Sequence, residues 1–256
     1  MYRNLFKIAL GGVLLTTFIT CKLQDDDNCA VAEGKLIDRI STTSFGHTTT
    51  EIFVYNAKNQ IDSIVKEVDN FLFYAFKYNE KNQLVERQMF TNYKNNLRKA
   101  RVDSLTYDVQ NRLINVRQYD SNEKDSLVFS NIKVFSYNSQ GKIDEEVTSY
   151  VNFQSSRIYE WDNDNVVRIT DYDGNKTKLH LFSFKYDDKK NPFLTTVYTY
   201  DEVQSRNNIV ESSVIDFSGR LDLIANPITR KYRYNSSNFP TLETNNAESK
   251  KVICYK

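Results

Sequence analysis

The sequence contains few of the residues that interrupt regular structure. Its 256 residues include seven Gly and three Pro, a content too low for a collagen-like or low-complexity disordered chain. It also lacks an excess of charge of one sign, because 34 Lys and Arg stand against 33 Asp and Glu. We therefore expect no basic field that would attract nucleic acid.

Residues that often carry catalysis or bind metals are scarce as well. The two His residues, His47 and His180, lie far apart and show no metal-ligand spacing. No G-x-S-x-G motif, phosphate-binding glycine loop or C-x-x-C pair occurs. The acidic stretch at Asp171 lacks the Gly and Glu positions of a calcium loop, and Glu145 and Glu146 are interpreted as part of a solvated face. We expect no catalytic residue, no metal and no cofactor, and hence no enzyme.

Aromatic residues, in contrast, are abundant, with 17 Tyr and 16 Phe, and such residues favour strands. Many of them fall in a nine-residue phrase that the chain repeats. FVYNAKNQI at Phe53–Ile61 and FKYNEKNQL at Phe76–Leu84 are two copies. With the Tyr of the phrase taken as position zero, the zero positions of the seven copies are Tyr55, Tyr78, Tyr107, Tyr137, Trp161, Tyr186 and Tyr234.

Each position of the phrase has a mechanical reason. A large apolar side chain stands two residues before position zero, on the same face of a strand, and an Asn or Asp follows position zero and can cap a turn. Position four suits the left-handed conformation of a short turn; its residues are Asn59, Asn82, Asn111, Gly141, Asn165 and Asn238. Position six starts the return strand; its residues are Ile61, Leu84, Leu113, Ile143 and Val167. Each copy therefore predicts a β-hairpin.

The spacing of the copies predicts the fold. Gaps of 23 to 30 residues fit one hairpin plus a turn back to the next copy, and the final gap of 48 fits a decayed unit at Asp216–Leu221. The repeated turns would lie on one edge and the variable connections on the other, which in repeat proteins is commonly the binding edge. We predict an all-β fold: a single antiparallel β-meander of about seven hairpin repeats, with roughly 14–16 strands, strongly curled or barrel-like. The zero-position residues are its expected core.

The amino terminus has the parts of an export signal. Arg3 and Lys7 precede an apolar run, Ile8–Ile19, that is too short to span a membrane. Cys21 follows, and the segment resembles a bacterial lipoprotein signal in which this Cys is lipidated. The acidic run Asp25–Asp27 resembles a surface-export signal of Bacteroidota-type lipoproteins. The predicted organisation is a signal peptide over residues 1–20, a lipidated acidic tether over 21–28 and the repeat domain over 29–256. Plain secretion, and an acidic run that is only a solvated spacer, are the alternatives.

Lipidation of Cys21 would leave an even pair of cysteines, Cys29 and Cys254, near the two ends of the domain. In a compartment outside the reducing cytoplasm such a pair can form a disulfide. Closing so long a loop would stabilise the fold by about 4–5 kcal/mol in the chain-entropy treatment. We predict a disulfide between these residues, with two separate buried thiols as the alternative.

The repeated pattern, Y-[ND]-x-x-[NG]-[QRK]-[IL], resembles the YD or RHS-type repeat of bacterial surface and toxin-shell proteins. Together with the lipoprotein leader, it resembles more closely the uncharacterised β-repeat lipoproteins of Bacteroidota. The resemblance spans about Phe53–Pro240. The repeat spacing is longer and less regular than in RHS shells, and no toxin segment follows the last copy, which disfavours a toxin-enclosing shell. The resemblance implies a β-hairpin repeat fold and supplies no activity.

These observations lead to two hypotheses. The first is a non-enzymatic binding module on the outer membrane, held by an N-terminal lipid anchor and facing the cell exterior, with a glycan or protein as ligand. Its surface binding residues would be tyrosines near the variable turns, namely Tyr93, Tyr119 and Tyr150. The second is a structural or carrier protein that encloses an apolar ligand within the curled sheet. Neither requires nucleic acid.

Overall fold

The computed structural model describes residues 36–67, 72–93, 96–195, 205–218 and 226–256. The export signal, Cys21, the acidic run and Cys29 lie outside the described residues. The predicted lipid anchor and tether therefore stay predictions.

The described chain consists almost entirely of antiparallel strands, which confirms the predicted fold class. The strands are β1 (Ile37–Ser44), β2 (His47–Tyr55), β3 (Ile61–Glu67), β4 (Leu72–Tyr78), β5 (Leu84–Tyr93), β6 (Asn96–Tyr107), β7 (Leu113–Ser121), β8 (Leu127–Tyr137), β9 (Ile143–Tyr150), β10 (Gln154–Asp162), β11 (Asn165–Asp173), β12 (Lys178–Lys190), β13 (Asn207–Asp216), β14 (Ile228–Tyr234), β15 (Pro240–Asn245) and β16 (Ser249–Tyr255). One 3-10 turn, η1 (Pro192–Thr195), follows β12.

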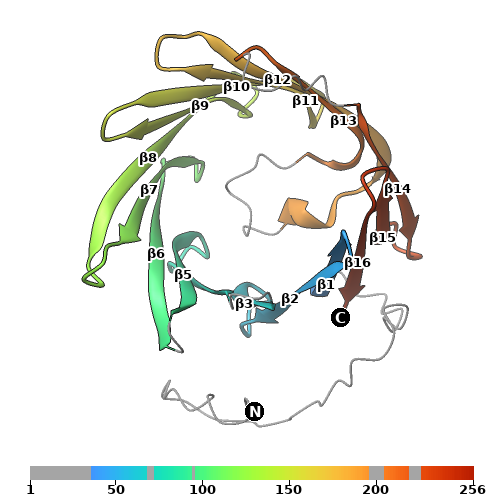
Figure 1. Ribbon diagram of the computed structural model, residues 1–256, viewed down its shortest axis with the longest axis horizontal. Helices are drawn as coiled ribbons and strands as arrows, with labels where there is room; N and C mark the ends of the chain where they lie inside the picture. Colours follow the sequence, from blue (N-terminus) through green and yellow to red (C-terminus); the bar gives the residue numbers. More distant parts are fainter. Residues whose placement is uncertain (1–35, 68–71, 94–95, 196–204, 219–225) are drawn as a thin grey trace.

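Each strand pairs with its neighbours in sequence, and β1 also pairs with β16, so the meander closes into a barrel of sixteen strands (Figure 1). Closure removes both sheet edges along most of the wall. The sequence predicted curling but left closure open. We call the end of the barrel that carries the turns of the repeated phrase the motif rim, and the opposite end the variable rim.

Most turns of the motif rim have the predicted geometry. In the first copy, the Asn56 side-chain oxygen accepts hydrogen bonds from the backbone N–H groups of Lys58 and Gln60, at 2.9 and 3.1 Å. Asn59 then takes a positive φ of 60°, as the residue after a type I turn does in a three-residue hairpin loop. Four further copies share the positive φ at position four: Asn82, Asn111, Gly141 and Asn238. Asn and Gly are selected here because they tolerate this conformation.

The copy at Trp161 differs from the prediction. Its turn is one residue shorter, because Asp162 pairs directly with Asn165. The positive φ therefore falls on Asn163 (49°) rather than on Asn165. Val166 takes the place predicted for Val167, since it pairs with Trp161 and is buried.

The copy at Tyr186 has no short turn. After Lys190 the chain continues through η1, which lies inside the ring of strands (Figure 1), and returns as β13 at Asn207. β13 ends at Asp216, opposite His180 near the start of β12, and therefore at the variable rim. The stretch at Asp216–Leu221 thus begins at the variable rim and not at a motif-rim turn, and its residues from 219 onward lie outside the described ranges.

The two chain ends together form an eighth repeat that the sequence analysis missed. Ile253 and Tyr255 occupy the apolar and zero positions of the phrase, and Ile37 on β1 occupies position six. The Lys256 N–H donates to the Leu36 carbonyl at 2.9 Å, as the Asn56 N–H does to Gln60 in the first copy. The barrel therefore contains seven continuous hairpins and one split between its ends.

The zero-position side chains form hydrogen bonds between adjacent repeats. The ladder between β3 and β4 ends at the Ser63–Ala75 pair, and the Tyr78 hydroxyl donates to the Ile61 carbonyl beyond it, at 2.9 Å. Equivalent donors and carbonyls are Tyr55 to Ile37, Tyr107 to Leu84, Tyr137 to Leu113, the Trp161 indole to Ile143, Tyr186 to Val166 and Tyr255 to Pro240. Each side chain thus donates a hydrogen bond to a backbone carbonyl at a position where the backbones of the two strands no longer pair. Trp can replace Tyr because its indole N–H also donates.

The copy at Tyr234 departs from this pattern. Its hydroxyl donates to the Asp187 carboxylate. Tyr232, two residues earlier on the same face of β14, donates instead to the Ile209 carbonyl, at 2.7 Å. The bond between repeats is therefore kept, but it is made by the neighbouring Tyr.

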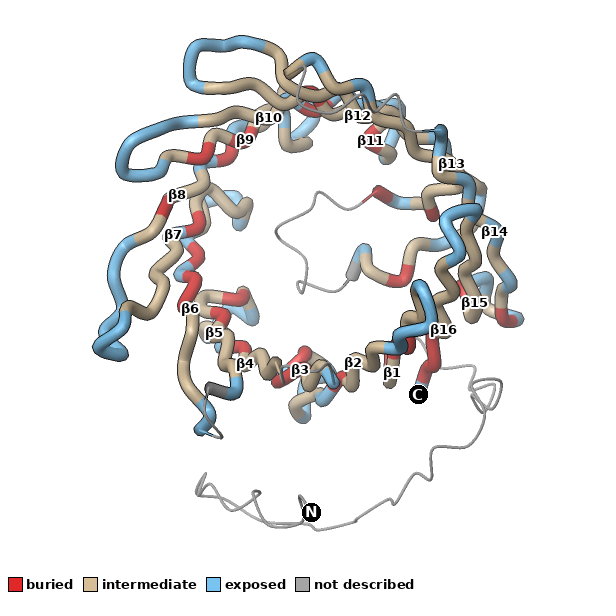
Figure 2. Tube along the Cα trace, viewed as in Figure 1, coloured by how far each residue is buried: buried red, intermediate tan, exposed pale blue. Residues whose placement is uncertain are grey.

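The side chains of the repeat pack on the inner wall. Phe53 and Ile64, which pair across β2 and β3, are fully buried, and Phe193 of η1 packs against their cluster from inside the ring. Val54, between Phe53 and Tyr55, is exposed on the outer wall. Buried residues occur along most of the wall (Figure 2), although the described residues of β12 and β14 include none. Among the zero-position residues, Tyr55, Tyr78, Tyr107 and Tyr137 are partly buried and pack against the cluster.

Replacing one of these donors should measurably weaken the fold. Tyr107→Phe removes the hydroxyl that reaches Leu84 at 2.8 Å and leaves a part-buried carbonyl without this partner. We expect the free energy of unfolding to fall by about 1–3 kcal/mol, measured by urea denaturation. Tyr119→Phe is the control, because no described residue bonds that hydroxyl. Equal effects of the two changes would contradict the bonding role of the zero position.

Candidate functional site

The two cysteines of the predicted disulfide are placed differently. Cys254 lies on β16, where its side chain is largely buried, and its sulfur accepts a hydrogen bond from Arg39 Nη2 at 3.6 Å. Cys29 lies outside the described residues. The pairing of the two stays a prediction.

Two of the three predicted binding tyrosines lie in aromatic pairs at the variable rim. Tyr119 on β7 meets Phe129 on β8 edge to face, with ring centroids 6.1 Å apart. Tyr150 at the end of β9 stacks on Phe153, with centroids 4.1 Å apart and planes 12° from parallel. Tyr93 ends β5, also at this rim, opposite Asn96, and its side chain is outside what the structure describes.

The partner residues Phe129 and Phe153 were missed by the sequence analysis. Both lie outside the repeated phrase, in LVFS and YVNF, beside variable turns. Their position could have identified them, because a large aromatic side chain next to a turn has few neighbouring strands to pack against. The structure therefore extends the predicted tyrosines to two aromatic pairs on neighbouring hairpins.

Exposed apolar side chains are concentrated at the same rim. Among the described residues, the exposed large hydrophobic side chains on its turns and strand ends are Phe45, Leu97, Leu127, Val128, Phe129, Tyr150, Val151, Phe153, Ile215 and Phe217. Those near the motif rim are Val109 and Leu194, and those on the outer wall are Val54, Val134 and Ile158. The barrel is thus unequal end to end, and the variable rim is its apolar end.

The inner wall carries a series of ion pairs, nearer the variable rim than the apolar cluster. Arg87 and Asp103 pair directly across β5 and β6 at 2.9 Å, with both side chains buried. Further pairs on the same face are Lys66–Glu51, Arg101–Asp120, Lys133–Glu146, Arg157–Asp171 and Arg230–Glu243–Lys251. Glu146 is only 4% exposed, so the expectation that it lies on a solvated face was wrong. A wall with matched charges of both signs suits water or a neutral polar ligand.

One part of the inner wall holds a histidine, His180, between two carboxylates. Arg157 Nε donates to Asp171 at 2.7 Å, and this bond raises the pKa of the Arg157 guanidinium. His180 Nδ1 lies 3.8 Å from Asp171, and its Nε2 lies 3.8 Å from Asp216. The two carboxylates are therefore separated by the imidazole and do not form an acid–base pair. His47 starts β2 at the variable rim, far from His180 along the ring.

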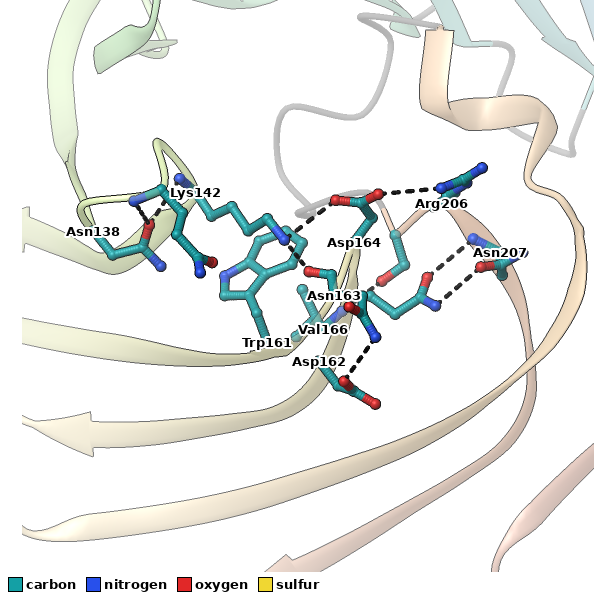
Figure 3. A network of polar contacts seen from close by, with 12 residues as sticks. Asn138, Lys142, Trp161, Asp162, Asn163, Asp164, Val166, Arg206 and Asn207 are labelled. Carbon is teal, nitrogen blue, oxygen red and sulfur yellow. Dashed lines mark hydrogen bonds and ion pairs between the residues drawn. The ribbon is translucent and has the colours of Figure 1, made fainter.

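A polar network fastens the segment that enters the ring. Arg206, just before β13, pairs with Asp164 at 3.3 Å, and Lys142 pairs with the same carboxylate at 3.2 Å while lying over the Trp161 ring (Figure 3). The Lys142 ammonium thereby lowers the pKa of Asp164. Asn165 and Asn207 exchange two hydrogen bonds, of 3.0 and 3.1 Å.

A buried serine completes this attachment. The Ser205 hydroxyl accepts from the Val166 N–H at 3.0 Å and donates to the Tyr186 hydroxyl at 2.8 Å. The network thus holds the return from η1 against the turn at Trp161. Its donors and acceptors bond one another, so we interpret it as structural.

Within the described ranges, no group of three or more His, Cys, Asp or Glu side chains could hold a metal ion. The described part of the chain also contains no helix long and apolar enough to cross a membrane. On the outer wall, a shallow depression lies over β10 to β13. Ion pairs line it, with Arg168 at 3.4 Å from Glu160 and Lys185 at 2.9 Å from Glu211.

Comparison with known proteins gives distant structural similarities. No family model and no curated protein matches the chain. A porin-like protein from Bacteroides vulgatus is 10% identical, with a TM-score of 0.43, over 86% of this chain and 98% of that one. A DUF3836 family protein from Parabacteroides distasonis is 13% identical, with a TM-score of 0.28, over 41% of this chain and 89% of that one.

A third similar structure is a Tc holotoxin pore of Photorhabdus luminescens. It is 11% identical, with a TM-score of 0.34, and the alignment covers 79% of this chain and 12% of that one. At these TM-scores the function of the present chain has to be argued from its own residues.

Proposed function

We propose that this protein is a non-enzymatic binding module, tethered by a lipid at Cys21 to the outer membrane and displayed on the cell exterior. Its partner, a glycan or a protein, is bound at the variable rim. The observation that carries the proposal is the inequality of the two rims. The chain enters the barrel at the motif rim, where Leu36 bonds Lys256, and exposed apolar side chains gather at the opposite end.

This arrangement supports display. Residues 21–35 would reach at most about 50 Å when fully extended, enough to hold the motif rim near the membrane and the variable rim away from it. Contiguous exposed apolar side chains on a soluble protein commonly mark an interaction site. The aromatic pairs Tyr119–Phe129 and Tyr150–Phe153 supply rigid contact area at such a site.

The outer wall supports a position in water. In the middle of β12, Lys185 pairs with Glu211 of β13 at 2.9 Å on the outer face. A basic side chain that faced the middle of a lipid bilayer would cost about 2–4 kcal/mol. These outward charges therefore favour a tethered domain surrounded by solvent.

The carrier of an apolar ligand is the less supported hypothesis. The inner wall does have an apolar layer around Phe53 and Ile64, but the ion pairs described above share that wall. An apolar ligand large enough to fill the ring would contact them and displace their water, at a cost in free energy. The same pairs would not oppose a polar ligand.

Export and tethering can be tested together on intact cells. We expect Cys21→Ala to release the protein from the membrane fraction, because acylation requires the Cys thiol. We also expect added protease to digest the wild-type protein without lysis, with a periplasmic protein as the protected control. Membrane retention of the variant would contradict the lipid anchor, and resistance to protease in intact cells would contradict display.

A further inference from the structure

We infer that the β7–β8 hairpin binds an extended peptide by adding it to the sheet as a strand, on the open edge of β8 over Leu127–Ser130. The inference rests on the proposal that the variable rim is the binding side, and it names the kind of partner. Barrel closure removes free sheet edges along most of the wall, and this edge remains because β8 extends further than β9.

The edge arises because β8 extends further toward the variable rim than its neighbour β9. On one side, β7 pairs with β8 as far as Leu127, opposite Ser121. On the other side, pairing with β9 starts only at Asn131, opposite Tyr150. Across the contiguous described stretch 96–195, no strand pairs with the β9 side of Leu127–Ser130. In Figure 1 the tip of the β7–β8 hairpin lies outside the ring of strands.

The open edge has the chemistry of a strand acceptor. The N–H and C=O groups of alternate residues point to where the next strand would lie, along about 13 Å of strand. Leu127, Val128 and Phe129 are each between 42 and 47% exposed. Edge strands are usually protected by Lys, Pro or inward charges, and Leu127–Ser130 contains none of these. A peptide added here would meet the stacked Tyr150 and Phe153 at one end.

The unpaired backbone decides which occupant fits. A lipid surface has no groups that bond backbone N–H and C=O in its apolar part, and a sugar ring does not follow the spacing of a strand. A second copy of this chain, paired antiparallel through the same edge, would bring its own turn residue Glu123 against Tyr150 and Phe153. Burying carboxylates against apolar rings is unfavourable. An extended peptide satisfies the backbone without that cost.

The test uses the full chain carrying Cys21→Ala. The probe is a fluorescent peptide of alternating threonine and valine with a lysine at each end. We expect saturable binding by fluorescence anisotropy. We expect binding to weaken by about tenfold or more when alternate amides of the peptide are N-methylated, because this removes the N–H donors along one edge of the peptide. Unchanged affinity for the methylated peptide, or no binding of either peptide, would overturn strand addition.

A matched pair of variants locates the site. Phe129→Lys places a charge at the open edge, and Val134→Lys places one at an equally exposed position on β8 that is paired on both sides. We expect only Phe129→Lys to weaken peptide binding, with thermal unfolding of both variants measured to verify folding. Equal loss in both would overturn the site. The inference would be overturned if the protein bound no peptide and sedimentation showed a dimer that Phe129→Lys dissociates. That result would assign the edge to a second copy of the chain.

The failure of this test is separable from failure of the proposed function. A pull-down that captures a partner through the variable rim, together with loss of capture on Phe153→Ser, would leave rim binding standing even if no peptide pairs with β8. Conversely, strand addition would be measured in solution, whatever the location of the protein in the cell.

Discussion

Arg87→Met is expected to destabilise the barrel by about 3–5 kcal/mol, the cost of leaving a buried charge without its partner. The Asp103 side chain is only 2% exposed and lies 2.9 Å from the Arg87 guanidinium. The second carboxylate oxygen of Asp103 has no hydrogen-bond partner among the described residues, so the pair depends strongly on Arg87. Urea denaturation followed by circular dichroism measures the change.

Two further variants make this prediction specific. Lys185→Met breaks an outer-wall pair whose Lys side chain is 71% exposed, and we expect a loss of no more than about 1 kcal/mol. The double change Arg87→Met with Asp103→Leu removes both buried charges, and we expect it to recover most of the lost stability. If the double variant were no more stable than Arg87→Met, the loss would come from packing and not from an uncompensated charge.

Alkaline unfolding between pH 10 and pH 12 is the second large expected effect. Burial raises the pKa of Tyr55, Tyr78 and Tyr107 to about 12 in the folded protein, against about 10 for an unfolded chain. Above pH 10 the unfolded chain loses these protons while the folded chain keeps them, so the free energy of unfolding falls as pH rises. The stabilisation is complete below pH 10 and is lost as pH approaches 12.

Because these hydroxyls also donate to backbone carbonyls, ionisation removes the bonds between repeats. We expect one cooperative transition that releases several protons, measured by circular dichroism together with tyrosinate absorbance. The Tyr119 hydroxyl makes no such bond to a described residue, so Tyr119→Phe is the control that removes one tyrosine without removing a bond between repeats. Tyrosinate absorbance that reached its full value while the strand signal remained intact would contradict the bonding role.

The repeated phrase was sufficient to predict the hairpins because its rules are local. An apolar residue, a donor aromatic, a capping Asn and a left-handed residue within seven residues determine one turn wherever it lies, as in Phe53–Asn59. The short turn at Trp161 was predicted with the wrong residue at positive φ. A one-residue change of loop length moves that conformation from Asn165 to Asn163 without altering the residue types.

The candidate binding surface was predicted only in part. Tyr119 and Tyr150 were expected there because they stand near variable turns. Their partners Phe129 and Phe153, and the open edge of β8, depend on how far each strand extends past its neighbour. That difference in length depends on how the strands pair with one another, and the composition of either strand alone does not predict it.

By itself, then, the sequence determined the local structure: antiparallel strands, turns at regular intervals and one inward face of aromatic and aliphatic side chains, because these follow from contacts within a few residues. Only the tertiary structure decided closure, since Tyr255 and Ile37 form one repeat from opposite ends of the chain. It also decided the inner ion pairs such as Arg87–Asp103, because the partner of a strand residue is set by register across the sheet.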